Sequence, residues 1–189
     1  MSSTTYIGKY DDAGSRNTFY RLNNRRYGFK SFETKALAEF AFRVQSYLST
    51  IDLAPKVYGE VGRINVVDSF GDKELSDWGY LTEIAKTLPE CYDDDCDGEC
   101  HDCGCENSCM ISDIVAAMEE NGLSYVDAHR GNFGYIRRNR QWIMVVIDVG
   151  YESFDYFDSS IYGPDPNDDE NNVNSSGCDC SICKRYANV

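Results

Sequence analysis

The sequence predicts an α+β protein built from two unequal parts that a cysteine-rich segment separates. Three observations support this fold class. Residues 1–88 contain several short β-type segments around one amphipathic helix. Residues 110–162 hold a second helix, expected over Met110–Asn121 with Gly122 to terminate it, and an apolar strand that ends in an Asp-x-Gly sequence. Residues 89–109, between these parts, carry six cysteines and almost no residues that could build a core.

The first part is expected to form a five-stranded antiparallel sheet. Segments 6–10, 18–22 and 27–32 are rich in aromatic residues and are separated by polar turns, which is typical of an antiparallel meander. Residues 64–68 and 80–85 supply two further strands, and the polar stretch between them is expected to be a loop.

A helix is expected over residues 33–51, between the third and fourth strands. Ser31 or Thr34 can cap its first turn. Apolar residues recur along it at steps of three and four, which places them on one face: Leu37, Phe40, Ala41, Val44, Leu48 and Ile51.

Composition limits the classes of partner. The 189 residues carry a formal net charge of −14, which argues against a nucleic-acid-binding surface because phosphate contacts need clustered Lys and Arg. The same charge would suit a basic protein partner. The sequence shows neither a signal peptide nor the run of about 20 apolar residues that spans a bilayer, so we expect a cytoplasmic protein without a membrane partner.

The stretch Asp127-Ala-His-Arg-Gly-Asn132 places a carboxylate five residues before an amide in a polar loop. An apolar strand over residues 142–147 follows and ends in Asp148-Val149-Gly150. Phosphoryl transfer needs such a set, in which one carboxylate orients the attacking hydroxyl while an amide and a second carboxylate hold Mg²⁺ against the phosphates. The alternative is a β-hairpin whose turn carries Asp, Gly and Asn as ordinary turn residues.

These two motifs resemble the catalytic loop and the metal-binding motif of the protein-kinase-like superfamily. With its Asp-x-His-x-Gly-Asn loop, the chain is more similar to the aminoglycoside and choline phosphotransferases than to eukaryotic protein kinases. Tyr125 stands where the family usually has a His, and Val149 where it usually has a Phe or Trp. The resemblance covers residues 6–85 loosely and 110–150 well, and it implies a two-lobed fold with a truncated second lobe.

The resemblance implies catalytic roles for Asp127, Asn132 and Asp148. Asp127 would orient the acceptor hydroxyl and take its proton, while Asn132 and Asp148 would hold Mg²⁺. His129 or Arg130 would steady the charge of the departing γ-phosphoryl group.

It also implies a site for the phosphates of ATP. Lys30 on the third strand would bind the α- and β-phosphates, and Glu39 of the following helix would pair with Lys30. Glu33 is a second candidate for that pair. The alternative for Glu39 is a surface ion pair with Arg43, four residues later.

Two further nucleotide contacts are implied by position. Gly14 lies in the loop between the first two strands, where the family has a glycine-rich phosphate loop, although it is the one glycine in this loop. The backbone of Glu83-Ile84-Ala85, just after the fifth strand, would bind the adenine edge.

Two Cys-x-x-Cys pairs, Cys100 with Cys103 and Cys180 with Cys183, have the spacing of thiolate knuckles that share one tetrahedral Zn²⁺. A disulfide knot and an iron–sulfur site are the alternatives. The remaining candidate ligands suffice for a second zinc: Cys91, Cys96, Cys105, Cys109, Cys178 and, beside them, His101.

Zinc would also compensate for a short C-terminal region. Residues 151–189 alone follow the Asp-x-Gly motif, and of these residues 163–177 form an acidic, turn-rich linker. A lobe this small buries little apolar surface. We therefore expect zinc to join residues 89–109 to the tail over 163–189, since zinc coordination can supply about 10 kcal/mol in small domains.

The sequence thus predicts an ATP-dependent phosphotransferase that moves the γ-phosphoryl group to a hydroxyl of a protein or of a small molecule. A catalytically weak, kinase-like binding or inhibitor module with an acidic, zinc-stabilised surface is the alternative. A third reading is a zinc-ribbon interaction protein whose kinase-like pattern is a coincidence.

Overall fold

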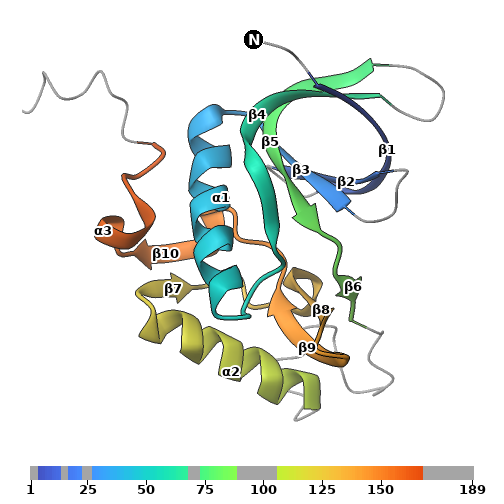
Figure 1. Cartoon of the computed structure of the whole chain (residues 1–189). Coiled ribbons are helices and arrows are strands. Elements are labelled where there is room, and N and C mark those ends of the chain that lie inside the picture. The colour runs from blue at the N-terminus through green and yellow to red at the C-terminus, as the bar shows by residue number, and fades with distance from the viewer. Residues whose placement is uncertain (1–3, 14–16, 23–26, 68–72, 89–105, 168–189) are drawn as a thin grey trace, which may run out of the picture.

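The computed structural model of the chain describes residues 4–13, 17–22, 27–67, 73–88 and 106–167. These residues form a mixed α+β fold with mostly antiparallel sheets, as the sequence predicts. Figure 1 shows a β-barrel at one end, the helix α2 at the other end, and the helix α1 between them, alongside β4.

Five strands close into the barrel in the order β1-β2-β3-β5-β4. Their bounds are β1 Thr4–Ala13, β2 Asn17–Leu22, β3 Tyr27–Phe32, β4 Val57–Val67 and β5 Lys73–Glu83. Neighbouring strands are antiparallel except for β1 and β4, whose parallel pairing closes the barrel. The prediction of five strands is confirmed, but the prediction of a wholly antiparallel sheet is wrong at this seam.

The expected loop between the last two strands is shorter than predicted. β5 already begins at Lys73, and its first residues pair with Arg63–Val67 at the end of β4. Residues 73–78 lack an apolar alternation, so backbone hydrogen bonds to β4, rather than a hydrophobic pattern, place them in the strand.

The helix α1 (Lys35–Thr50) confirms the predicted amphipathic segment. Thr34 caps it, because its hydroxyl accepts a hydrogen bond from the backbone N–H of Leu37 at 3.2 Å. One side of the helix packs Ala38 and Ala41 against the barrel, while Phe40 and its neighbours on the stripe join the core of the C-terminal half. α1 therefore contributes to two cores and connects them.

A buried amide fixes α1 to the barrel. The Nε2 atom of Gln45 donates to the Pro55 carbonyl at 3.0 Å and to the Thr82 hydroxyl at 2.5 Å, and its Oε1 atom accepts from the Tyr80 hydroxyl at 2.9 Å. Burial, aided by the nearby charge of Asp148, holds the pKa of Tyr80 well above its usual value, so Tyr80 stays a neutral donor. These hydrogen bonds fix the position of α1 relative to β5.

The C-terminal half (residues 86–88 and 106–167) is built around two small sheets and α2 (Glu106–Glu120). One sheet has the order β6-β8-β9 and the other pairs β10 with β7. Its remaining elements are β6 Lys86–Thr87, β7 Leu123–Tyr125, β8 Phe133–Arg138, β9 Gln141–Val146, β10 Phe154–Phe157, α3 Ser159–Tyr162 and the 3₁₀ turns η1 Arg130–Asn132 and η2 Tyr151–Ser153.

The second helix begins earlier than predicted. α2 starts at Glu106, four residues before the expected Met110, and it therefore includes the last cysteine of the cysteine-rich segment. It ends at Glu120, one residue before the predicted Asn121, and Gly122 just beyond has φ of +77°, a conformation that favours glycine. No helix in the described part of the chain is long and apolar enough to cross a membrane.

Candidate functional site

The loop between β7 and β8 is held by its own side chains. Asn132 is buried in η1, and its Nδ2 atom donates to the Asp127 carboxylate at 2.7 Å and to the Asp127 carbonyl at 2.9 Å. The Asn132 carbonyl in turn accepts from the backbone N–H of Ile147 at 2.7 Å. The end of β9 is thereby fixed against the loop that carries Asp127.

Asp148 follows Ile147 directly, and a side chain of β7 holds its backbone by a hydrogen bond. The hydroxyl of Tyr125 donates to the Asp148 carbonyl at 3.0 Å. Burial, with the charges of Asp148 and Asp127, holds the pKa of Tyr125 well above its usual value, so the phenol is a neutral donor at physiological pH. Tyr125 stands where the resemblance leads one to expect a His, and it positions the second carboxylate of the site.

Lys30 joins the barrel to this loop system. Its side chain is 7% exposed, and its ammonium donates to the Ile147 carbonyl at 2.5 Å and contacts the Asp148 carboxylate at 3.4 Å. A buried ammonium needs such oxygen partners, because its desolvation otherwise costs several kcal/mol. The structure therefore brings together four residues that the sequence singled out: Lys30, Asp127, Asn132 and Asp148.

His129 and Arg130 flank the same loop. The Nε2 atom of His129 lies 3.5 Å from the Asp127 carboxylate, and both side chains are about half exposed. Arg130 is the first residue of η1. The exposed side of Asp127 is thus accessible to a solvent-borne hydroxyl, with an imidazole beside it.

Glu39 does not make the predicted pair with Lys30. Its carboxylate bonds Lys35 at 2.8 Å, one turn earlier on the exposed side of α1. Lys30 is already occupied by oxygens of the β9 end, so no contact draws Glu39 inward. The alternative pair with Arg43 is wrong too, because Arg43 donates to a backbone carbonyl of α3, and the second candidate, Glu33, is exposed.

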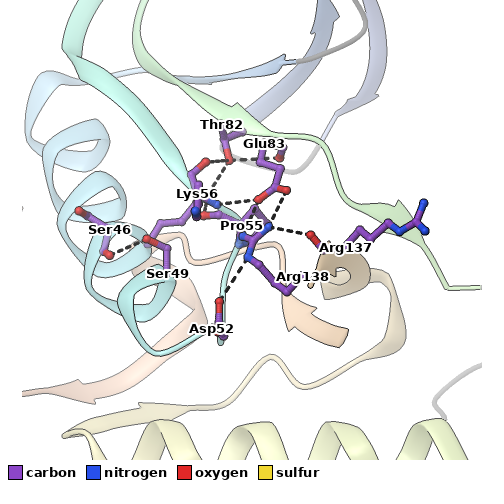
Figure 2. Close-up of polar contacts among 10 residues, drawn as sticks. Ser46, Ser49, Asp52, Pro55, Lys56, Thr82, Glu83, Arg137 and Arg138 are labelled. Atoms are coloured by element: carbon purple, nitrogen blue, oxygen red, sulfur yellow. Dashed lines mark hydrogen bonds and ion pairs between the residues drawn. The ribbon is translucent and has the colours of Figure 1, made fainter. Parts of the chain in front are cut away.

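Glu83 has a role that the sequence did not suggest. Its carboxylate accepts two hydrogen bonds from the guanidinium of Arg138, from the Nη1 atom at 2.8 Å and from the Nη2 atom at 2.6 Å. Both are drawn in Figure 2. The backbone N–H of Lys56 also donates to the carboxylate, at 3.2 Å, and the Nε atom of Arg138 reaches Asp52 at 3.3 Å. This cluster connects the end of β5, the loop after α1 and the β8–β9 hairpin.

The backbone of Glu83 is already engaged. Its N–H donates to the Lys56 carbonyl at 2.8 Å, and its carbonyl accepts from the Thr82 hydroxyl at 3.3 Å. Ala85 lies against Gly134 of β8, close to where β6 pairs with that strand. The edge of an adenine ring would therefore have to bind the backbone groups of Ile84 and Ala85, because the Glu83 N–H already has a partner.

Most predicted zinc ligands and one predicted phosphate contact cannot be placed. Gly14, His101 and eight of the nine cysteines lie outside the described residues. Cys109 is described, and it is exposed on the first turn of α2. In the described ranges, no three His, Cys, Asp or Glu side chains gather closely enough to hold a metal ion.

No model of a protein family matches the chain, and no curated protein is significantly similar to it in sequence. The function must therefore be inferred from the motifs and their geometry.

The cluster around Glu83 predicts a pH-dependent loss of stability when Arg138 is changed. Burial alone raises the pKa of Glu83, but the hydrogen bonds from Arg138 and the Lys56 N–H, with the guanidinium charge, bring it below the usual 4.5. The pair therefore stabilises the fold fully at pH 7 and loses its effect as pH falls below 4.5 through the folded pKa. Arg138→Gln should lower the free energy of unfolding by about 1–3 kcal/mol at pH 7.

Urea unfolding at pH 7 and at pH 4 measures this effect. Arg140→Gln is the matched control, because Arg140 is exposed on the same hairpin and should change stability by less than about 0.5 kcal/mol. The deficit of Arg138→Gln should shrink at the lower pH. An equal deficit at both pH values, or an equal effect of the two variants, would show that the pair does not carry this stability.

Proposed function

We propose that the chain is an ATP- and Mg²⁺-dependent phosphotransferase that moves the γ-phosphoryl group to a hydroxyl of a protein or of a small molecule. The observation that carries the proposal is the continuous set of contacts from Lys30 through Ile147 and Asp148 to Asn132 and Asp127. It gathers an ammonium, an amide and two carboxylates from three separate segments.

The arrangement of elements supports a two-lobed, kinase-like fold for this reaction. Lys30 lies on the third strand, a helix follows it, and the second helix leads into a short strand, the Asp127 loop, a hairpin and Asp148-Val149-Gly150. This is the order that the resemblance implies. The barrel would then be the nucleotide-binding lobe, and the C-terminal half would be the catalytic lobe.

Each residue has a chemical role consistent with its position. Asp127 is 44% exposed, so its carboxylate can orient an acceptor hydroxyl and take its proton. The donor set of Asn132 and Asp148 suits Mg²⁺, because the Asn132 nitrogen is bound to Asp127 and leaves the amide oxygen to join the Asp148 carboxylate. When bound, Mg²⁺ would neutralise charge on the phosphates. Lys30 would bind the α- and β-phosphates with its ammonium.

A second candidate is a kinase-like binding module with weak catalysis or none. One observation favours it: Glu39 bonds Lys35 instead of Lys30, while Lys30 contacts Asp148. A lysine held by the carboxylate that should bind magnesium would keep the fold without presenting its charge to a nucleotide. Such a module would act through its acidic surface on a basic partner.

Phosphate transfer by full-length protein separates these candidates. Radiolabelled Mg²⁺-ATP and a cell lysate as the source of acceptors should give labelled product, and Asp127→Asn should lower the rate by about 10²- to 10⁴-fold through loss of the base. Asp113→Asn is the matched control, since it removes the same charge from the exposed side of α2.

Thermal unfolding provides the second readout of the same experiment. Millimolar Mg²⁺-ATP should raise the melting temperature of wild type and of Asp127→Asn alike, because Asp127 does not hold the nucleotide. Stabilisation without labelling would favour the binding module. Neither stabilisation nor labelling, or equal labelling by wild type and Asp127→Asn, would contradict the proposed enzyme.

We further propose that one or two Zn²⁺ ions join the cysteine-rich segment to the tail. The Cys-x-x-Cys spacings support this, and Cys109 on the first turn of α2 is an exposed free thiol. Elemental analysis of protein purified under reducing conditions should find one or two zinc ions per chain, and a chelator should lower the melting temperature. A stably folded, metal-free chain would contradict this proposal.

A further inference from the structure

The segment after Asp148-Val149-Gly150 lines an open hollow of about 490 Å³. It is formed by η2, β10, α3 and the residues that follow α3. The side chains that matter for its chemistry are four aromatic residues and two carboxylates: Tyr151, Phe154, Tyr156, Phe157, Asp155 and Asp165. The hollow is separate from the four residues to which catalysis is assigned above.

Three of the aromatic rings are held in place by α1. The ring of Phe40, which is fully buried, meets the rings of Tyr151, Phe154 and Phe157 edge to face, at centroid distances of 5.6, 6.0 and 4.8 Å. Tyr156, by contrast, is 61% exposed. Three of the four rings are therefore packed against α1, and the fourth, Tyr156, is open to solvent.

The charge of the hollow is negative. Asp165 is oriented by the Tyr151 hydroxyl, which donates to its Oδ2 atom at 2.8 Å. Asp155 is exposed, and no ion pair to it is found within the described ranges. Among the described residues, no Lys, Arg or His lines the hollow, and the neighbouring Arg43 donates to the Tyr162 carbonyl at 2.6 Å.

We propose that this hollow binds a cationic side chain, arginine or lysine, of a protein partner. Aromatic faces attract a guanidinium or an ammonium within about 6 Å, and a planar guanidinium can also stack on them. Asp155 and Asp165 at the rim complement the charge. The net charge of −14 would favour the approach of a basic segment and disfavour an anionic one.

This proposal does not depend on phosphotransfer. A basic segment bound here would lie beside the Asp148 motif, because Tyr151 follows Gly150 in the chain. The site could therefore serve either an enzyme that recognises a basic protein or a binding module that does so. Failure of either proposal leaves the other standing, since binding and phosphate transfer are measured separately.

Fluorescence polarisation with the full-length protein tests the site. The probe is a labelled peptide, Gly-Ser-Arg-Gly-Arg-Ser-Gly, at 0.15 M salt, a level chosen to screen diffuse attraction. Saturable binding is expected, and Tyr156→Ala or Asp155→Asn should weaken it about three- to ten-fold. Matched controls are Trp142→Ala, an exposed aromatic on β9, and Asp113→Asn, an exposed carboxylate on α2, which should each change affinity by less than about two-fold.

Several outcomes would overturn the proposal. Equal weakening by Asp155→Asn and Asp113→Asn would mean that the peptide is held by overall charge. Equal affinity for a peptide with Glu in place of both Arg would remove the cationic requirement. Absence of saturable binding up to millimolar peptide would mean that the hollow is not a docking site. Because Tyr156 and Asp155 are exposed, unchanged melting temperatures should show that both variants fold.

Discussion

The buried ammonium of Lys30 is the interaction on which the site depends. Lys30 lies on β3 of the barrel, and its partners are the Ile147 carbonyl and the Asp148 carboxylate at the end of β9. A charge so enclosed requires oxygen atoms at short distance, and within the described ranges the end of β9 supplies them. The same requirement therefore sets the position of the barrel against the Asp148 motif and places a cation at the site proposed for the phosphates.

Three hydrogen bonds from uncharged donors extend this constraint to the rest of the site. Tyr125 holds the Asp148 backbone, the Ile147 N–H holds Asn132, and the Asn132 amide holds Asp127. Each donor is buried and uncharged or is a backbone group, so the geometry persists across physiological pH. α1 adds a second support, because it shares one face with the barrel and the other with the aromatic residues that follow Gly150. The proposed catalytic residues and the proposed docking hollow are thus supported by the same helix.

Local patterns predicted the parts of this structure that depend on local physics. The period of apolar residues predicted α1, Thr34 was one of two predicted caps, and Gly122 was the predicted terminator of α2. The Asp127 and Asp148 motifs singled out residues that the structure places close together. Local patterns could not predict the parallel pairing of β1 with β4. They also could not predict the ion pair of Arg138 with Glu83, because these residues are 55 positions apart in the sequence. Lys35 and Arg43 both lie one turn from Glu39, so spacing alone could not select the partner of Glu39.

A crystal structure with Mg²⁺ and a non-hydrolysable ATP analogue tests most directly the site formed by Lys30, Asp127, Asn132 and Asp148. The metal should contact the Asn132 amide oxygen and the Asp148 carboxylate, and the Lys30 ammonium should exchange Asp148 for a phosphate oxygen. The Asp127 carboxylate should keep its bond to Asn132 and face the γ-phosphate. A nucleotide bound elsewhere, or one that leaves Lys30 on Asp148 and Asn132 without metal, would contradict the assignment of these four residues to phosphoryl transfer.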